Sequence, residues 1–470
     1  MKENWYDKFN RKSEVADSKN KRKEFNKERD KFFEAKRRKA LEKHQDPSFS
    51  QKKTSCKIDG IITETEHLFS ASSLPKDSVE ILNNFDSVIQ NVRPLNSRQI
   101  LKLPKDIRAL SHQLTDERSV RRVGYMNAAE ELSAYVRYFS WWNLVRFTRI
   151  FSNLPENAFS LKDGDACIDI GSGPLTVVTA LWLSRPELRN KKLTFYCMDL
   201  SQSALSLGEN IYLSVAAKTP PKDKNADAHW NIIKVKGGAG TFIKRKAAFI
   251  SCANMFNEIR ENSESRPDEM AQAQVKTLLS YADENTSFFI AEPGMPVAAH
   301  FVSLMRGKLL ENNFHIISPC PHEKDCAMSG LHARFGGSAK WCNLSFTTED
   351  APQKLLKLSK DAGIPKERAV VTFIFAKREN FVKKEIVRDE NSISKSPDGK
   401  TILPLRIASD PIWLPENRQG FYACSRHGLV VIVNMTHKKL ISGDKIKVSM
   451  LKSIDTLPKD KKSGAVEINV

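Results

Sequence analysis

The stretch that most constrains the fold is a short apolar segment that runs directly into two glycines. Residues 166–170 read Ala-Cys-Ile-Asp-Ile, and Gly171-Ser172-Gly173 follow at once. A second apolar segment at 177–183 has a helical pattern. Glycines allow a sharp turn and let a ligand approach the backbone closely. The order of strand, glycine turn and helix predicts the start of a nucleotide-binding α/β domain.

Further strand and helix patterns alternate after this turn. The β-like segments are 193–198, 231–235, 248–252 and 287–291, with helical patterns at 203–216 and 269–281. Such alternation predicts an α/β fold with a mostly parallel, doubly wound sheet of the Rossmann-like type. Residues 370–376 are also strongly β-like, and we expect them to return to the same sheet as an edge strand.

Two acids frame the glycine turn in the manner of S-adenosylmethionine enzymes. Asp169 stands two residues before Gly171, where an acid can hold the amino group of the methionine moiety. Asp199 ends the second strand, where a carboxylate suits the two ribose hydroxyls. The candidate cofactor contacts are therefore Asp169, Gly171, Gly173, Asp199 and, after the fourth strand, Asn254. The alternative is a purely structural turn, with Asp199 capping the next helix.

The pattern departs from that of active enzymes in two places. Leu175 stands where D-x-G-x-G-x-G has its third glycine, and Thr176 excludes the G-x-G-x-x-G of dinucleotide oxidoreductases. Methyl transfer to a base nitrogen often uses an Asn/Asp-Pro-Pro-aromatic turn after the fourth strand. Residues 251–258 contain Asn254 and Phe256 but no proline. The catalytic residues remain unknown, and both an enzyme and a binding scaffold stay open.

The charge of the chain favours a polyanionic partner. Its formal net charge is +19, and residues 1–45 contain 16 Lys and Arg against 9 Asp and Glu. Nucleic acid is the first candidate partner and an acidic membrane surface the second. No apolar run approaches the ~20 residues of a membrane span, so we expect a soluble, cytoplasmic protein. The aromatic residues at 135–142 indicate a helix that packs in the core or, alternatively, stacks on bases.

Composition suggests a division into five parts. We expect a basic arm at 1–50, a helical lead-in region at 51–155 and a Rossmann-like domain at 156–378. That domain contains a Cys-rich insertion at 318–348. A charged linker at 379–400 leads to a small, barrel-like β module at 401–470.

The eight cysteines fall into different settings. Cys167, Cys197 and Cys252 lie in apolar strands and are expected to be core thiols. Cys56 has no evident role. The remaining four are Cys320, Cys326, Cys342 and Cys424. Four thiolates suit a structural zinc or an iron–sulfur cluster, although the C-x5-C spacing matches neither a zinc knuckle nor the common ferredoxin pattern. Unligated thiols are the alternative.

Taken together, these motifs resemble the methyltransferase-like family that associates with the small ribosomal subunit in mitochondria and many bacteria. The resemblance covers roughly residues 115–435. It is carried by the glycine turn, by Glu-Pro-Gly-Met-Pro at 292–296, by Cys-Pro-His at 320–322 with Cys326, and by Trp341-Cys342. Ala327-Met328 and Asn343-Leu344 depart from residues that are usual in the family.

The resemblance implies a Rossmann-like S-adenosylmethionine-dependent methyltransferase fold and a [4Fe–4S] cluster held by Cys320, Cys326, Cys342 and Cys424. Of these, Cys424 is matched only by its place in the β module. It also implies binding to small-subunit ribosomal RNA, with a role in assembly or translation, in mitochondria if the source is eukaryotic. A monomer is favoured. The alternatives are a non-catalytic iron–sulfur assembly factor and a zinc-binding nucleic-acid protein.

Overall fold

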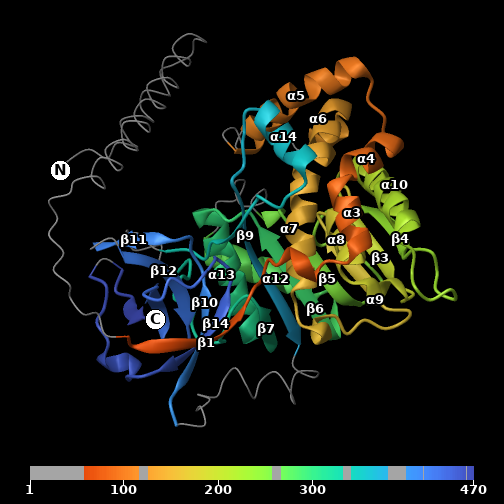
Figure 1. Cartoon of the computed structure of the whole chain (residues 1–470). Helices are drawn as coiled ribbons and strands as arrows, with labels where there is room; N and C mark the ends of the chain where they lie inside the picture. Colours follow the sequence, from red (N-terminus) through yellow and green to blue (C-terminus); the bar gives the residue numbers. More distant parts are fainter. Residues whose placement is uncertain are drawn as a thin grey trace. The chain divides into compact units, whose positions relative to one another are not determined.

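The described residues of the chain form two β-sheets, one mostly parallel and one mostly antiparallel (Figure 1). The computed structural model describes residues 58–115, 125–256, 266–331, 340–378, 399–415, 418–461 and 463–470. Residues 58–470 form one compact unit. The predicted arm at 1–50, Cys56 and nearly all of the linker at 379–400 lie outside the described residues.

The larger sheet has the strand order β4-β3-β2-β5-β6-β9-β7, with β8 paired to β9. Its strands are β2 (Ala166–Ile170), β3 (Thr194–Asp199), β4 (Asn231–Lys236), β5 (Ala247–Ala253), β6 (Ala282–Glu292), β7 (Phe314–Ser318), β8 (Leu344–Thr347) and β9 (Arg368–Arg378). Strands β2 to β6 are mutually parallel, which confirms the doubly wound sheet predicted from the sequence.

The expectation of an edge strand at 370–376 was wrong. Strand β9 runs antiparallel between β6 and β7 and is paired on both sides. The physical reason is that residues 369 and 371–377 are buried, and an edge position would leave one row of their backbone N–H and C=O groups unpaired. Strand β9 follows α14 (Gln353–Asp361) in the chain and is antiparallel to β6, β7 and β8.

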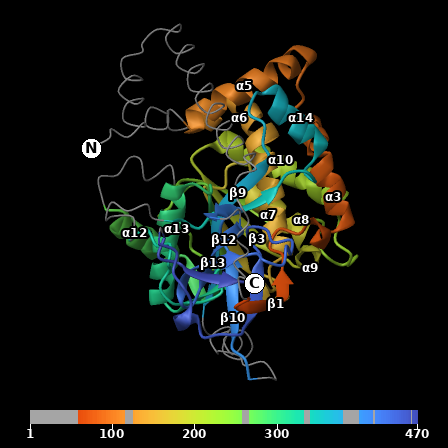
Figure 2. The same cartoon turned by 60° about the vertical axis from the view of Figure 1, so that its left-hand side comes forward.

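Helices cover both faces of this sheet. One face carries α7 (Trp141–Ser152), α8 (Thr176–Ser184) and α10 (Gln202–Lys218), and the other carries α12 (Pro267–Leu279) and α13 (Pro296–Glu311) (Figure 2). Every residue of β2 is buried as a result. Cys167, Cys197 and Cys252 are buried free thiols, as predicted for core positions.

The lead-in region contributes helices at one end of the molecule and alongside the sheet. They are α3 (Lys76–Asn83), α4 (Phe85–Val92), α5 (Ser97–Thr115) and α6 (Ala129–Ala134). The short α9 (Pro186–Arg189) lies later in the chain, between α8 and β3. Helix α6 continues through a π-helical segment, η4 (Tyr135–Ser140), directly into α7. Figures 1 and 2 both show α5, α6 and α14 together beyond the carboxyl end of the parallel strands.

The second sheet combines the C-terminal strands with one strand from the lead-in region. Its order is β1-β14-β10-β12-β13-β15, with β11 on β12. The strands are β1 (Gly60–Glu66), β10 (Ile402–Ile407), β11 (Ile412–Leu414), β12 (Arg418–Ser425), β13 (Gly428–Val433), β14 (Lys445–Met450) and β15 (Val466–Asn469). Assigning all of 51–155 to a helical region therefore missed β1, whose polar alternation is a weak strand signal.

Asp59 connects β1 and β15, the two outermost strands in the order of the second sheet. Its backbone N–H donates to the carbonyl of Asn469 at 2.9 Å, and its carboxylate accepts from the Asn469 amide side chain at 2.7 Å. The Nζ of Lys452 lies 2.5 Å from the same carboxylate. Asp59 is buried, so these partners offset the cost of removing its charge from water.

Helix α10 packs directly on the glycine turn through Gly208. This glycine is buried, and a Cβ added to it would lie only 2.4 Å from the carbonyl carbon of Pro174. Gly307, in the interior of α13, offers a comparison because a Cβ added there would meet nothing within 4 Å. The two helical glycines therefore differ in whether a side chain has room.

This difference generates a first prediction. Alanine stabilises a helix interior by about 1 kcal/mol relative to glycine when nothing obstructs it, so Gly307→Ala should raise the free energy of unfolding slightly. Gly208→Ala should instead lower it by about 2 kcal/mol or more, because the new methyl group overlaps backbone that cannot move aside. Denaturant unfolding of both variants checks this, and equal effects of the two substitutions would contradict the packing described here.

Candidate functional site

The glycine turn joins β2 to α8 at the carboxyl edge of the parallel sheet. Gly171 and Gly173 have φ values of 67° and 50°, in the left-handed region that glycine adopts without strain. Leu175, at the position of the missing third glycine, is also left-handed with φ 54° and is completely buried. The backbone therefore has the left-handed conformation at residue 175 although a leucine stands there in place of a glycine.

Asp169 lies beneath the turn and faces the interior. Its two carboxylate oxygens accept hydrogen bonds from the hydroxyls of Ser172 and Ser251, both at 2.6 Å. Burial raises its pKa to about 6, with a smaller contribution from the charge of Asp199, while the two serine hydrogen bonds oppose the shift. Since Asp169 is only 1 % exposed, its direct contacts are with the protein.

Asp199 ends β3 and ties that strand to the turn. One carboxylate oxygen accepts from the backbone N–H of Gly173 at 2.9 Å, and the other accepts from the N–H of Ser201 at 2.8 Å. Burial raises its pKa, and these backbone hydrogen bonds oppose the shift. Each oxygen of a carboxylate accepts more than one hydrogen bond, so the group retains acceptor capacity for a ligand.

Two methionines, which the sequence did not single out, lie against the glycines. A Cβ on Gly171 would be 3.1 Å from the Cγ of Met255, and a Cβ on Gly173 would be 3.8 Å from the Cε of Met126. Met126 belongs to η3 (Tyr125–Asn127), and its carbonyl accepts from the Ser201 hydroxyl at 3.2 Å. No local sequence pattern brings η3 to the turn, because the contact is set by tertiary packing.

Asn254 follows β5 at the same edge of the sheet. It has φ 57°, a left-handed conformation that asparagine tolerates better than most residues. Its backbone N–H donates to the carbonyl of Ala291 at 2.8 Å, and the N–H of Phe256 donates to Glu292 at 2.8 Å. The five predicted cofactor contacts therefore lie on the carboxyl ends of the adjacent strands β2, β3 and β5.

The four remaining cysteines line a single cavity of about 40 Å³. Cys320 follows β7, Cys326 lies in the next loop, Cys342 precedes β8, and Cys424 belongs to β12 of the second sheet. Residues far apart in sequence thus meet between the two sheets. Within the described residues, no group of three or more His, Cys, Asp or Glu side chains is arranged to hold a metal ion.

Two guanidinium groups border the cysteine cavity. Arg306 donates to the carbonyl of His322 at 2.7 Å, and Arg406 donates to the carbonyl of Pro319 at 2.6 Å. Burial raises the pKa of Cys326 to about 11, with the neighbouring Cys320 adding to the shift. The Nε2 of His322 lies 3.0 Å from the Sγ of Cys424. The cavity is therefore rich in thiols and positively charged at its border.

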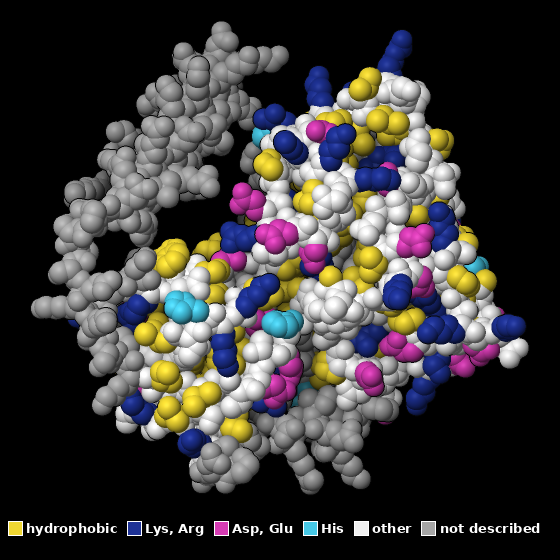
Figure 3. Space-filling model, viewed as in Figure 1, with side chains coloured by type: hydrophobic (Ala, Val, Ile, Leu, Met, Phe, Trp, Pro, Cys, Tyr) yellow, Lys and Arg dark blue, Asp and Glu magenta, His cyan; other side chains and the backbone are white. Residues whose placement is uncertain are grey.

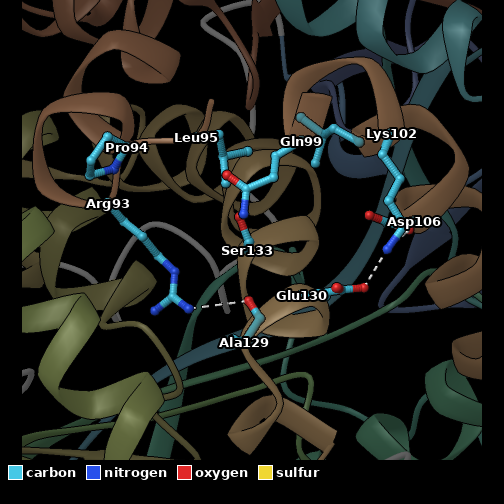
Figure 4. A pocket seen from close by; sticks show the side chains of 10 residues that line it. Arg93, Pro94, Leu95, Gln99, Lys102, Asp106, Ala129, Glu130 and Ser133 are labelled. Carbon is cyan, nitrogen blue, oxygen red and sulfur yellow. Dashed lines mark hydrogen bonds and ion pairs between the residues drawn. The ribbon is translucent and has the colours of Figure 1, made fainter. Parts of the chain in front are cut away.

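A second cavity, of about 320 Å³, lies between α5, α6 and the loop after α4 (Figure 4). Its charged groups are already paired with one another or with the backbone. The Nζ of Lys102 lies 2.5 Å from a Glu130 oxygen, and the Nη2 of Arg93 donates to the carbonyl of Ala129 at 3.2 Å. The cavity has room for a small ligand but no excess of one charge.

The strand order and the glycine turn define the fold. A parallel sheet with an antiparallel strand inserted beside its last strand is the Rossmann-like fold of S-adenosylmethionine-dependent methyltransferases. The chain belongs to the family described as mitochondrial small ribosomal subunit Rsm22, whose model matches residues 146–396. This finding confirms the family resemblance seen in the sequence.

Solved structures of methyltransferases resemble the chain only distantly. A putative class I S-adenosylmethionine-dependent methyltransferase from Listeria monocytogenes is 11 % identical, with 66 % of this chain and 89 % of that chain covered and a TM-score of 0.30. Precorrin-6y C5,15-methyltransferase from Geobacter metallireducens is 11 % identical, with 47 % and 84 % covered and a TM-score of 0.27. No curated protein matches significantly. No helix within the described residues is long and apolar enough to cross a membrane.

The raised pKa of Asp169 leads to a prediction about pH. A folded-state pKa of about 6, above the ordinary value of 3.8, means that the folded protein binds this proton more tightly than the unfolded chain. The cost of the buried charge is therefore present above about pH 6 and is lost as the pH falls. Asp169→Asn never carries that charge. The wild type should gain about 2–3 kcal/mol of stability relative to this variant between about pH 7.5 and pH 4.

Denaturant unfolding of both proteins across this range measures the difference. The comparison between the two removes the contributions of other titrating groups. A pH-independent difference would show that the Asp169 carboxyl group titrates normally.

Proposed function

We propose that the protein is a methyltransferase-like factor of the mitochondrial small ribosomal subunit that binds ribosomal RNA and holds S-adenosylmethionine at the glycine turn. The observation that carries the proposal is the position of Asp199 beside Gly173 at the carboxyl edge of a methyltransferase-type sheet. The description of its family supports the ribosomal partner and the compartment. A role in ribosome assembly or translation follows from that partner.

Asp199 and Asp169 take different parts in the proposed cofactor site. Asp199 is placed to accept the two ribose hydroxyls, because its oxygens keep free lone pairs after binding two backbone N–H groups. Asp169 instead orients Ser172 and thereby the turn, since its carboxylate is bonded to two serine hydroxyls and is almost completely buried. Asn254, at the end of β5, borders the same edge and is assigned to the cofactor or the substrate.

A basic surface supports binding to RNA. Helices α5 and α14 contact each other and expose lysine and arginine side chains at one end of the molecule (Figure 3). The exposed cations are Arg98, Lys102, Lys105, Arg108, Lys354, Lys357 and Lys360. Such a surface attracts the phosphates of RNA. The basic arm at 1–50 adds further positive charge to the protein and supports the same proposal.

We assign a [4Fe–4S] cluster to the cysteine cavity, with Cys320, Cys326, Cys342 and Cys424 as its ligands. The assignment depends on the donor set and not on the present arrangement of the thiols, because four thiols line one cavity and four thiolates are the usual ligands of such a cluster. Arg306 and Arg406 would offset the negative charge of four thiolates. The cluster would link the parallel sheet to the second sheet through Cys424. Zinc is the alternative metal for the same thiols.

Cys320→Ser tests the metal assignment. We expect the substitution to remove most of the iron and sulfide and to destabilise the C-terminal half, because the ligands would no longer join the two sheets. Metal analysis and the absorption near ~400 nm of anaerobically purified full-length protein provide the measurement. Ile374→Val, at a residue that lines the same cavity and has no atom able to bind a metal, is the matched control. Unchanged metal content in Cys320→Ser would refute the four-cysteine assignment, and zinc without iron would replace the cluster.

Transfer of a tritiated methyl group to small-subunit particles tests the enzymatic part of the proposal. Incorporation into the RNA is expected if the site is catalytic. The non-catalytic alternative is favoured by one observation, since the stretch after β5 lacks the proline turn used in methyl transfer to base nitrogens. Retained binding to the particles without incorporation would establish the protein as an RNA-binding scaffold. Loss of binding as well would contradict the whole proposal.

A further inference from the structure

Between residues 132 and 150, the helix that runs from α6 through η4 into α7 is buried except along one narrow stripe. Between residues 132 and 150, the residues that are only partly buried are Tyr135, Phe139, Asn143 and Arg146. Their spacing of four, four and three residues places them on one face of the helix. The stripe begins in the π-helical segment, a form of helix that is frequent at functional sites.

Aromatic rings form one end of the stripe. The rings of Tyr135 and Phe139 stack with a centroid distance of 5.7 Å and an interplanar angle of 24°. Tyr138, by contrast, is buried, and its ring meets Phe139 edge to face at 5.1 Å. The aromatic residues of this helix are therefore divided between the core and a partly exposed stacked pair. The stacked pair of Tyr135 and Phe139 fits base stacking, which the sequence analysis left open as an alternative to core packing.

Two cations lie at the other end of the stripe. Arg146 donates to the Asn143 side chain at 2.7 Å, and among the described residues its buried Nε has no hydrogen-bond partner. Lys366 precedes β9, and its Nζ lies 5.3 Å from the centroid of the Trp142 ring. Within the described part of the chain, neither cation forms an ion pair with an acidic side chain. Burial, with the charge of Arg146 as a second cause, lowers the pKa of Lys366 to about 7.

We propose that this stripe and Lys366 bind a single-stranded segment of RNA, with a base on the Tyr135–Phe139 pair and a backbone phosphate between Arg146 and Lys366. Phe139 and Arg146 are seven residues apart, a distance of about 10 Å along the helix axis, which suits neighbouring nucleotides. A phosphate would supply the negative charge that the two cations lack. The inference rests on the proposed RNA-binding function and names the site at which it occurs.

Substitution of Lys366 tests the phosphate contact. The full-length protein is titrated with small-subunit ribosomal RNA at several salt concentrations. Lys366→Met should weaken RNA binding about five- to tenfold. It should also reduce the salt slope, the dependence of the logarithm of the binding constant on the logarithm of the salt concentration, by about one. Lys366→Arg should retain the affinity and the slope of the wild type. Lys276→Met, on the exposed face of α12, removes the same charge elsewhere and should leave the affinity nearly unchanged. Thermal unfolding of each variant checks that the fold is retained.

Phe139→Leu tests the stacking contact, because leucine keeps an apolar side chain but has no ring for a base. It should weaken RNA binding about fivefold or more without changing the salt slope. If Lys366→Met and Phe139→Leu bind RNA like the wild type, this inference is wrong while the proposed function stands. Weaker S-adenosylmethionine binding with unchanged RNA binding would likewise overturn it in favour of a cofactor contact. A wild type that binds no RNA overturns both proposals.

Discussion

The site depends on one carboxylate at the end of β3. Asp199 accepts hydrogen bonds from the backbone of the glycine turn and from the start of α10, so it joins the turn, β3 and α10. Helix α10 in turn packs its Gly208 against the backbone of Pro174. The turn is therefore fixed from two sides, by a charge-assisted hydrogen bond and by a contact that allows no side chain. Asp169 completes this support from below.

The second sheet is attached to the first by polar contacts around the cysteine cavity. Arg406 donates to the carbonyls of Pro319 and Gly443, which belong to opposite sides of the junction. The backbone N–H of Asn343 donates to the carbonyl of Ala408 at 3.2 Å. Loops that contain three of the four cysteines are thereby held against the sheet that contains the fourth. The proposed cluster would strengthen a junction that the protein already forms.

Much of the parallel sheet could be predicted from the sequence, because strands buried on both faces appear as continuous apolar runs. The glycine turn and Asp199 were recognisable for a similar reason, since their spacing is local. The position of β9 and the pairing of β1 with β14 were not predictable, because both depend on partners distant in sequence. Likewise, no pattern placed Met126 against Gly173 or Lys366 beside Arg146, since only the folded chain brings them together.

The pairing of the second sheet has a consequence for the order in which the chain folds during synthesis. Strand β1 cannot pair until β14 has been synthesised, and Asp59 cannot bind Asn469 until the end of the second sheet has been synthesised. The parallel strands β2 to β6, by contrast, have all their neighbours except β9 within the first 292 residues. Because domains fold largely in the order in which they leave the ribosome, the nucleotide-type core forms early. The cysteine cavity, which needs Cys424, is among the last features to form.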